Sequence, residues 1–470
     1  MKRLGIILGV TLLSIFLILF IVFFFSTSSV ETISYFDADY YHKTIARLDS
    51  IKSTNAVKIN DSMEAGFAKV NITPGLNNAE DNFSEGKFTQ VPLAGYGGRE
   101  GKPATGVHDS VFVKAAALKV GDQTVIFVSA DLLIMPPNVA DSVTKLLSEK
   151  GIRREQLFFS ATHTHSSIGA WAGGYVGEMF AGKENPGVAR WLALQISEVV
   201  MSAINDLRPA RIGTGNFPVG AYTNNRLIGK PGTKNNDFSF ITLEQIGHKK
   251  AIIGSYSAHA TTLSEDNWEI SADYPGYWAR KIEQTSADYA LFFAGSVGSQ
   301  SPAGEGNGFD KSKYIGEALA DSLNAHLADA GLKNTVTFSS LSLKMHLPEY
   351  KVRLTSNINL VPFLSKKLMP FSDNVYVQAV RIGDMIWITT PSDFSGEFAL
   401  QLKNSLSAYG FNANVTSFNG SYVGYLVPGR YFYLDEYEPK VMGWFGPNMG
   451  EYTMDVIRQV LRVITNSDNI

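Results

Sequence analysis

The stretch Val111–Ala130, VFVKAAALKVGDQTVIFVSA, indicates the fold class most directly, because it contains two strand-like runs joined by a Gly-Asp pair at 121–122. Such a pair between two apolar runs is a strong signal for a β-hairpin. A helical pattern follows from Asn138 to Lys150, and the run from Gln156 to Ala161 is typical of a short buried strand. A second helix is expected over Val188 to Leu207, and strands alternate with helices beyond it. The sequence therefore predicts a mixed α/β fold with β-sheet layers flanked by helices.

The composition favours one large folded domain and excludes some kinds of chemistry. Of the 470 residues, 45% are apolar and 18% are charged, which is the balance of a globular protein with a large core. The formal net charge is -3, so basic residues are not in excess and nucleic acid is not an expected partner. The chain has no cysteine, so any metal must be held by histidine, carboxylate or tyrosine. Nothing in the composition indicates an oligomeric state.

The N-terminus carries an apolar run of membrane length. Lys2 and Arg3 precede an uncharged apolar stretch from Leu4 to Phe25. About 20 apolar residues suffice to span a bilayer, whereas a cleavable signal has an apolar region of roughly 7–15 residues. We expect an uncleaved membrane anchor. A signal cut near Ser26 and a buried core helix are the alternatives.

The positions of the early charges predict the orientation of the chain. Lys2 and Arg3 are the only early cations, and positive residues stay on the cytoplasmic side of a membrane. We expect residues 1–3 to be cytoplasmic, 4–25 to be the anchor or signal, 26–62 to be a polar stalk and 63–470 to form an extracytoplasmic catalytic domain. Cleavage of the anchor would make the protein secreted.

Near the start of this domain, Gly66 to Pro74 alternates like an edge or terminal strand that ends at a proline.

Three histidines follow predicted strands. His163 and His165 come directly after the run that ends at Ala161, and His259 follows the apolar run from Ala251 to Tyr256. Alternate residues of an extended segment point to the same side, so the imidazoles of His163 and His165 can face one cavity. Catalytic zinc sites use about three nitrogen or oxygen ligands and keep a position open. The spacing alone fits a structural role for each histidine as well as a metal site.

A carboxylate, two phenols and a serine complete the candidates. Asp393 ends a strand-like run, where it could be a metal ligand or the N-cap of the next helix. Tyr425 and Tyr437 could offer phenols, although clustered aromatic residues usually form packing surface. Ser301 lies in a loop of small residues after another predicted strand, where backbone N–H groups could form an oxyanion site or the loop could simply turn the chain.

Together these segments resemble the neutral/alkaline non-lysosomal ceramidase family, in its N-terminal catalytic domain. The similarity runs from about Gly66 to Tyr437, and the motifs occur in the family's order. The motifs are Gly95-Tyr-Gly-Gly98, Thr105-Gly-Val-His-Asp109, Val128-Ser-Ala-Asp131, Ala161-Thr-His-Thr-His-Ser166, Asn225-Arg226, His259-Ala-Thr261, Ser301-Pro302, Pro391-Ser-Asp-Phe-Ser395, Gly424-Tyr425 and Tyr437-Glu438.

The resemblance implies a zinc site and a set of residues that contact the substrate. One zinc ion per chain would be bound by His163, His259, Asp393 and Tyr425. The residues that would contact the substrate amide or its developing oxyanion are His165, Arg226 and Tyr437, with Ser301 as the nucleophile or a nucleophile-like hydroxyl.

The chain departs from the family pattern at several places. Asp393 stands where the family has a glutamate, which keeps a competent zinc ligand on a shorter side chain. Polar residues around Ser301 are changed, which weakens the case for a covalent role more than the case for the metal. The segment after His165 lacks the usual glycine-rich stretch, so a different substrate channel is expected. The similarity stops near the end of the chain, so the family's C-terminal immunoglobulin-like domain is not expected.

The resemblance implies hydrolysis of the amide bond of ceramide or a ceramide-like N-acyl lipid, giving a fatty acid and a sphingoid amine. A lipid substrate suits an enzyme that is anchored in the membrane where that substrate partitions. Two alternatives stay open. The first is a zinc hydrolase of a different N-acyl amine or ester, and the second is a non-catalytic cell-surface binding protein on a degenerate enzyme scaffold.

Overall fold

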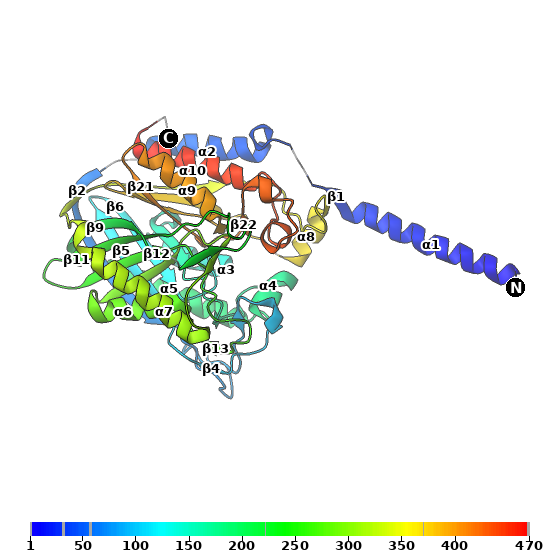
Figure 1. The fold of residues 1–470 in the computed structure, drawn as a ribbon, viewed down its shortest axis with the longest axis horizontal. Coiled ribbons are helices and arrows are strands. Elements are labelled where there is room, and N and C mark those ends of the chain that lie inside the picture. The colour runs from blue at the N-terminus through cyan, green and yellow to red at the C-terminus, as the bar shows by residue number, and fades with distance from the viewer. Residues whose placement is uncertain (1, 31–32, 56–58, 221, 370, 468–470) are drawn as a thin grey trace.

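A curled sheet of twelve strands forms the centre of the fold (Figure 1). Its long strand β2 (Ile59–Asn71) pairs antiparallel with β5 (Phe112–Val120), β9 (Arg208–Pro218) and β16 (Thr335–Met345). The computed structural model describes the whole chain except residues 1, 31–32, 56–58, 221, 370 and 468–470. The other strands of this sheet are β6 (Gln123–Ala130), β7 (Leu157–Ala161), β11 (Asp237–Gln245), β12 (Lys250–Tyr256), β14 (Tyr289–Ala294), β18 (Val375–Ile382), β19 (Met385–Thr389) and β21 (Asn412–Thr416).

The predicted hairpin is confirmed. Strands β5 and β6 pair antiparallel from Val113 opposite Ala130 to Val120 opposite Gln123. Gly121 turns the chain with a φ of 56°, a conformation that glycine adopts without steric cost. Helix α3 (Pro137–Ser148) then leads to β7, which pairs parallel with β6, so the helix and the buried strand that the sequence predicts are also present.

The expected edge or terminal strand is the second half of β2, which ends at Asn71. Strands β9 and β16 pair only with residues 59–65 of β2, whereas the described pairing of residues 66–71 is with β5. Pro74 lies beyond the end of β2 at Asn71, so it removes no hydrogen bond from the ladder.

The sheet curls so that strands distant in its order share one core. The ring of Phe127 on β6 lies 4.7 Å from Phe158 on β7 and 6.0 Å from Trp387 on β19, measured between ring centroids. Phe293 on β14 joins the same cluster. At the carboxyl ends of the strands, Ser417, directly after β21, donates its N–H to Ala294 O at 3.0 Å, at the end of β14. The curl therefore brings the carboxyl ends of β7, β14 and β21 together.

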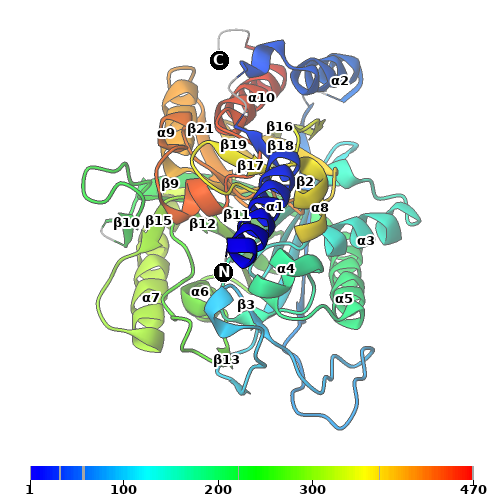
Figure 2. The same cartoon turned by 90° about the vertical axis from the view of Figure 1, so that its right-hand side faces the viewer.

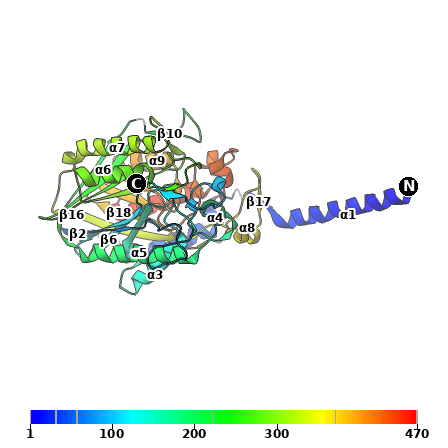
Figure 3. The ribbon, with the colours of Figure 1, turned by 90° about the horizontal axis from the view of Figure 1, so that it is seen from below.

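Helices cover the outer faces of this curled sheet. Figure 3 shows α6 and α7 on one side of the sheet and α3 and α5 on the opposite side. Three further helices, α2, α9 and α10, pack over β16, β18, β19 and β21. The bounds of these helices are α2 Asp39–Asn55, α5 Pro186–Asn205, α6 Asp273–Thr285, α7 Gly308–His326, α9 Gly396–Ser407 and α10 Met449–Thr465. The mixed α/β fold predicted from the sequence is thus present.

Short strands and helices line the loops at the strand ends. Strand pairs form between β3 and β8, β4 and β13, β10 and β15, and β20 and β22. Two short helices, α4 (Gly174–Ala181) and α8 (Pro362–Leu368), contact each other. The bounds of the short strands are β3 Leu93–Ala94, β4 Gly106–Val107, β8 Ser167–Ile168, β10 Thr223–Asn225, β13 Glu269–Ile270, β15 Gln300–Pro302, β20 Asp393–Phe394 and β22 Tyr425–Leu426.

The N-terminal apolar run forms helix α1 (Lys2–Ser26), which projects away from the body (Figure 1). Its residues Ile6–Ser26 are entirely unburied and have a mean hydropathy of 3.1, so α1 is a candidate membrane anchor or signal. Helix α5 also has the length and composition of a membrane span, but 44% of it is buried and its apolar side chains belong to the core.

Most of the segment expected to be a stalk is packed on the body. Strand β1 (Thr27–Ser29) pairs with β17 (Ile358–Leu360). On α2, Leu48 is fully buried in the core, and the hydroxyl of Thr44 lies 2.7 Å from that of Tyr452 on α10. Strand β2 then begins at residue 59. A free stalk over 26–62 is therefore wrong for these parts, because the amphipathic helix α2 buries its apolar face against α10 and β16.

Candidate active site

Three histidines from two strand ends meet at one point. His163 and His165 follow β7, and His259 follows β12. The closest ring nitrogens of the three histidines all lie within 4.8 Å of one another, which is the spacing of a group that could hold one metal ion. His163 has a φ of 65°, a left-handed conformation that costs on the order of 1–3 kcal/mol for a residue other than glycine. The ring of Phe418 stacks on the His163 imidazole with centroids 4.3 Å apart, which holds the imidazole in place.

Asp393 and Tyr425 join these histidines. Asp393 Oδ1 lies 3.3 Å from His163 Nε2 and 3.2 Å from His259 Nε2. The hydroxyl of Tyr425 lies 2.9 Å from His259 Nε2. Asp393 and Tyr425 are direct neighbours in the parallel strand pair β20–β22. The four residues proposed as zinc ligands from the sequence therefore converge on one point, and His165 Nε2 lies 3.3 Å from His163 Nε2 beside them.

The hydrogen bonds of the histidines fix which nitrogen carries the proton. His163 Nδ1 lies 2.6 Å from Leu133 O, and His259 Nδ1 lies 2.8 Å from Gln300 O. A carbonyl oxygen only accepts hydrogen bonds, so each Nδ1 carries the proton and each Nε2 presents a lone pair. Both lone pairs point toward the buried Asp393 Oδ1, which has no hydrogen-bond partner among the residues that the structure describes.

The His163 Nε2 lone pair and the Asp393 carboxylate oxygen repel each other in a buried site unless a cation lies between them, whereas the His259 lone pair also accepts from Arg226. Burial and the neighbouring Arg226 lower the pKa of His259 to about 3, which keeps it in the neutral form that binds metals. The donor set of nitrogen and oxygen atoms fits a zinc ion.

Arg226 supplies a fixed positive charge at the edge of this cluster. Its Nη2 donates to Tyr425 Oη at 2.8 Å and to His259 Nε2 at 3.0 Å, while its Nε donates to Glu438 Oε1 at 2.7 Å. Glu438 is buried and also accepts a hydrogen bond from Ser299 Oγ at 2.7 Å. Burial opposes the charge of Arg226, but Tyr425 and Glu438 raise its pKa above the ordinary value. The guanidinium is thus held in one orientation and remains charged.

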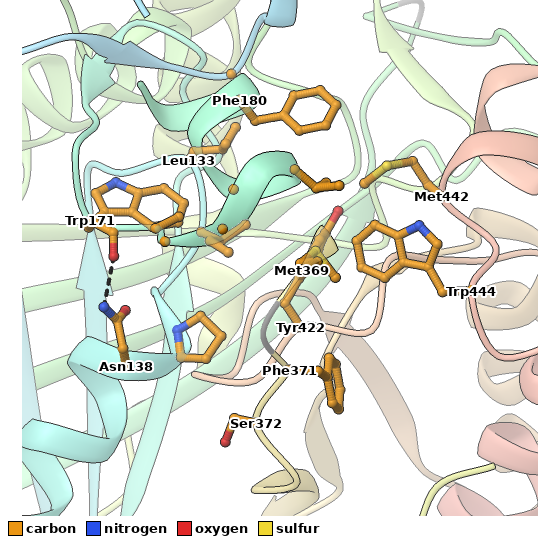
Figure 4. Close-up of a pocket in the computed structure, with 18 of the residues that line it drawn as sticks. Leu133, Asn138, Trp171, Phe180, Met369, Phe371, Ser372, Tyr422, Met442 and Trp444 are labelled. Atoms are coloured by element: carbon orange, nitrogen blue, oxygen red, sulfur yellow. Dashed lines mark hydrogen bonds between the residues drawn. The ribbon is translucent and has the colours of Figure 1, made fainter. Parts of the chain in front are cut away.

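An apolar cavity of about 550 Å³ opens onto the cluster. His163, His165, Asp393, Tyr425 and Tyr437 lie on its wall at the polar end. Figure 4 shows the apolar side chains that surround the rest of the space. They include Leu133, Trp171, Phe180, Met369, Phe371, Met442 and Trp444. A cavity of this size and lining suits a small molecule with a long apolar part.

Ser301 is placed differently from the other candidates. Its hydroxyl donates to Asn224 O at 3.4 Å. Like Arg226 and His259, it is not among the described residues that line the cavity, but those two residues contact the cluster directly. The serine of the same loop that faces the cluster is Ser299, through its hydrogen bond to Glu438. The structure thus brings together His163, His165, Arg226, His259, Asp393, Tyr425 and Tyr437, and leaves the Ser301 hydroxyl outside the cavity wall.

The structure also excludes the alternative role of Asp393 and reveals two residues that sequence reasoning missed. The N-cap of α9 is Ser395, whose hydroxyl accepts from Glu397 N, so Asp393 is not the cap. Tyr422 donates to Asp393 Oδ2 at 2.7 Å and thereby orients the carboxylate. Glu438 was visible in the Tyr437-Glu438 motif, but no local pattern indicates its pairing with Arg226, which is 212 residues away.

Comparisons with known proteins find similarity in sequence and in fold. Residues 84–307 match the family described as neutral/alkaline non-lysosomal ceramidase, N-terminal. The neutral ceramidase of Mycobacterium tuberculosis (strain ATCC 25618 / H37Rv) is 24% identical over 250 residues, which is 47% of this chain and 39% of that relative. The chain therefore matches well under half the length of this relative.

Two solved structures share the fold. The crystal structure of neutral ceramidase from Pseudomonas aeruginosa superposes with a TM-score of 0.71 at 16% identity, over 86% of this chain and 75% of that chain. A ceramidase complexed with C2 superposes with a TM-score of 0.73 at 16% identity, over 87% of this chain and 76% of that chain. The single mixed α/β domain predicted from the sequence is thus confirmed.

The family resemblance that the motifs indicated is also confirmed. The matched segment contains His163, His165 and His259, and Asp393 and Tyr425 come to the same point from strands beyond it. Over residues 84–307, this chain resembles the neutral/alkaline non-lysosomal ceramidase family, whose model matches that segment.

Proposed function

We propose that this protein is a zinc-dependent amidase that hydrolyses ceramide or a ceramide-like N-acyl lipid to a fatty acid and a sphingoid amine. The observation that carries the proposal is the apolar cavity, whose wall at one end includes His163, His165 and Asp393. An acyl chain fits the apolar part while its amide reaches the polar end. The match of residues 84–307 to the neutral/alkaline non-lysosomal ceramidase family supports the same chemistry.

The residues that would hold the zinc ion are His163, His259, Asp393 and Tyr425. When bound, zinc polarises a carbonyl and lowers the pKa of a bound water from about 15.7 toward about 7. The fit rests on the two Nε2 lone pairs that face Asp393 Oδ1. His165 is a further nitrogen ligand within reach of the same point.

The other polar residues would stabilise charge that develops on the amide. Arg226 presents N–H groups beside Tyr425, and its charge is fixed by Glu438. Burial raises the pKa of Tyr437 above its ordinary value, so its hydroxyl stays protonated and can donate. Burial lowers the pKa of His165 well below its ordinary value, so the ring stays neutral. Donors aimed at the developing oxyanion lower the barrier, because they act mainly in the transition state.

The N-terminal helix supports a membrane location for this activity. We propose that α1 anchors the chain and that the folded body lies outside the cytoplasm, since Lys2 and Arg3 precede the apolar run. If the segment is cleaved as a signal, the body is secreted. The anchor would confine the enzyme to the surface where its lipid substrate partitions.

A hydrolase of a different N-acyl amine or ester is the second candidate. The position of Ser301 favours it, because the hydroxyl that the family pattern assigns as nucleophile faces Asn224 O. A changed nucleophile and a changed channel would alter the substrate while the metal site is kept.

Two measurements on the purified full-length chain in detergent test the proposal. Metal analysis should find one zinc per chain, and a panel of ceramides, other N-acyl amines and esters should release fatty acid fastest from ceramides. Faster release from another N-acyl compound would select the second candidate. A zinc-free preparation with full activity, or a zinc-loaded one that cleaves none of the panel, would contradict the zinc-amidase proposal.

A further inference from the structure

The membrane-length helix is fastened to the body next to the cavity. Ser26, the last residue of α1, accepts a hydrogen bond from Val361 N at 2.9 Å, and Val30 N donates to Asn357 O at 3.0 Å. Between these two bonds, β1 pairs with β17 in register from Thr27 opposite Leu360. The helix is therefore not connected through a free linker, and its exit direction is tied to the segment that leads into α8.

The segment fastened to the helix also forms part of the cavity wall. Helix α8 begins at Pro362, directly after the β17 region, and Met369 and Phe371 at its far end line the cavity. Helix α4 contacts α8 and lines the cavity through Val176 and Phe180. Figure 2 looks along α1 toward the body, with α8 and α4 beside it. Helix α1 thus projects from the same end of the body at which α4 and the α8 segment line the cavity.

On these elements, exposed apolar side chains lie next to residues that line the cavity. Tyr175 and Met179 on α4 are 70% and 37% exposed, between or beside the lining residues Val176 and Phe180. Phe363 on α8 is 66% exposed. Val441 is 47% exposed and precedes the lining residue Met442. Large apolar side chains exposed around a cavity are costly in water and mark a surface that is covered by a partner.

Basic side chains stand beside the most exposed ring on α8. Lys366 and Lys367 are both exposed in the last turn of α8. Lys367 Nζ lies 4.5 Å from the centroid of the Phe363 ring. Aromatic rings with lysines alongside are typical of segments that lie at the interface of a bilayer, where the rings enter the lipid and the cations meet the headgroups.

We propose that α4, α8 and residues 437–442 form a bilayer-docking face, which the pairing of β1 with β17 holds against the membrane that α1 spans. Tyr175, Met179, Phe363 and Val441 enter the lipid interface, and the cavity opens toward the bilayer. A lipid can then pass into the cavity without crossing water. Docking of this face requires only that α1 lies in a bilayer. The further step, in which a lipid substrate enters the cavity from the bilayer, rests on the proposed function.

The absence of cysteine makes the docking directly measurable. Single variants Phe363→Cys, Tyr175→Cys and Ile246→Cys of the full chain would carry an environment-sensitive fluorophore in nanodiscs of phosphatidylcholine and phosphatidylglycerol. Ile246 is the matched control, because it is an apolar side chain, 58% exposed, in the turn between β11 and β12. Leu13→Cys in α1 reports the anchor itself.

We expect doxyl-labelled lipids to quench the fluorophores at 363 and 175 strongly and at shallow depth, and to quench the one at 13 at greater depth. The fluorophore at 246 should be unaffected. If the fluorophores at positions 363 and 175 are quenched no more strongly than the one at position 246, the docking face is contradicted. If the fluorophore at position 13 is not quenched, α1 is not in the bilayer and the docking proposal fails with it.

A double variant separates docking from hydrolysis. Phe363→Asp with Tyr175→Asp should reduce kcat/KM for an N-acyl lipid embedded in a bilayer by at least about tenfold, since charges oppose entry into the interface. The same variant should cleave a water-dispersed short-chain substrate at the parent rate, because neither residue lines the cavity. An equal loss on both substrates, or no loss on either, would contradict the docking. A parent that cleaves neither substrate would refute the proposed function, while the quenching pattern would still decide the docking.

Discussion

At the inner end of the cavity the side chains come from the ends of long strands, whereas at its mouth they come from short helices and loops. His163, His259 and Asp393 follow β7, β12 and β19, and two of them are held by hydrogen bonds to backbone carbonyls. Helices α4 and α8 have 8 and 7 residues and carry exposed apolar side chains. The comparison indicates that a rigid scaffold positions the chemistry, while the mouth is free to differ between substrates.

The strongest test of this division removes a residue from the inner end. His163→Ala should lower zinc occupancy and reduce amide hydrolysis by at least about 10³-fold, because a ligand and its Asp393 contact are lost together. Zinc content and fatty-acid release measure the two effects. His326→Ala is the control, since that histidine stacks on Phe217 away from the cluster. A normal turnover rate in His163→Ala would falsify the zinc-amidase proposal.

The second test addresses the charge beside the cluster. Arg226→Gln should reduce kcat by about 10²-fold with little change in KM, which is the scale for losing one donor to a developing oxyanion. Arg226→Lys keeps the charge but not the paired contacts to Tyr425 and Glu438, so it should recover only part of the rate. Steady-state kinetics with zinc-loaded protein separate the two constants. A change confined to KM would mean that Arg226 only binds substrate.

A third and smaller effect, on zinc affinity, is expected at Tyr422, which contacts the proposed ligand Asp393. Tyr422→Phe removes the hydrogen bond to Asp393 Oδ2 and should weaken zinc binding by about 10- to 100-fold, measured by chelator competition. Tyr350→Phe is a matched control, because Tyr350 is buried and its hydroxyl has no partner among the described residues. Equal zinc affinity in both variants would show that Tyr422 does not position the carboxylate.

The smallest effect is expected at Ser301. Ser301→Ala should leave zinc bound and reduce kcat by less than about tenfold, since its hydroxyl faces Asn224 O outside the cavity wall. Ser299→Ala should cost more, because it leaves the buried Glu438 Oε2 without that donor. A loss of about 10³-fold or more in Ser301→Ala would restore the assignment of this serine as nucleophile.

Local patterns in the sequence predicted the elements well. The Gly-Asp pair at 121–122 predicted the β5–β6 hairpin, and the apolar run after Arg3 predicted a helix of membrane length. These predictions succeed because a tight turn needs particular residues at its centre, and because an apolar run of that length has few other stable environments. The order of the motifs also predicted the resemblance to the family whose model matches residues 84–307.

Predictions that depended on a neighbour distant in sequence were less successful. Residues 26–62 are polar enough to read as a stalk, yet Leu48 is buried because α2 finds an apolar partner in α10, at the other end of the chain. Whether a segment is covered depends on surfaces that other parts of the chain provide.

The sequence by itself determined which residues were available for a metal site: histidines after two strands, a carboxylate after a third, and no cysteine. Only the tertiary structure decided that these residues meet, because the curl of the sheet brings the ends of β7, β12 and β19 to one point. It also decided that Tyr422 and Glu438 support the cluster and that the Ser301 hydroxyl donates to Asn224 O. These contacts join side chains whose directions depend on the packing of the whole core, which no local pattern of residues records.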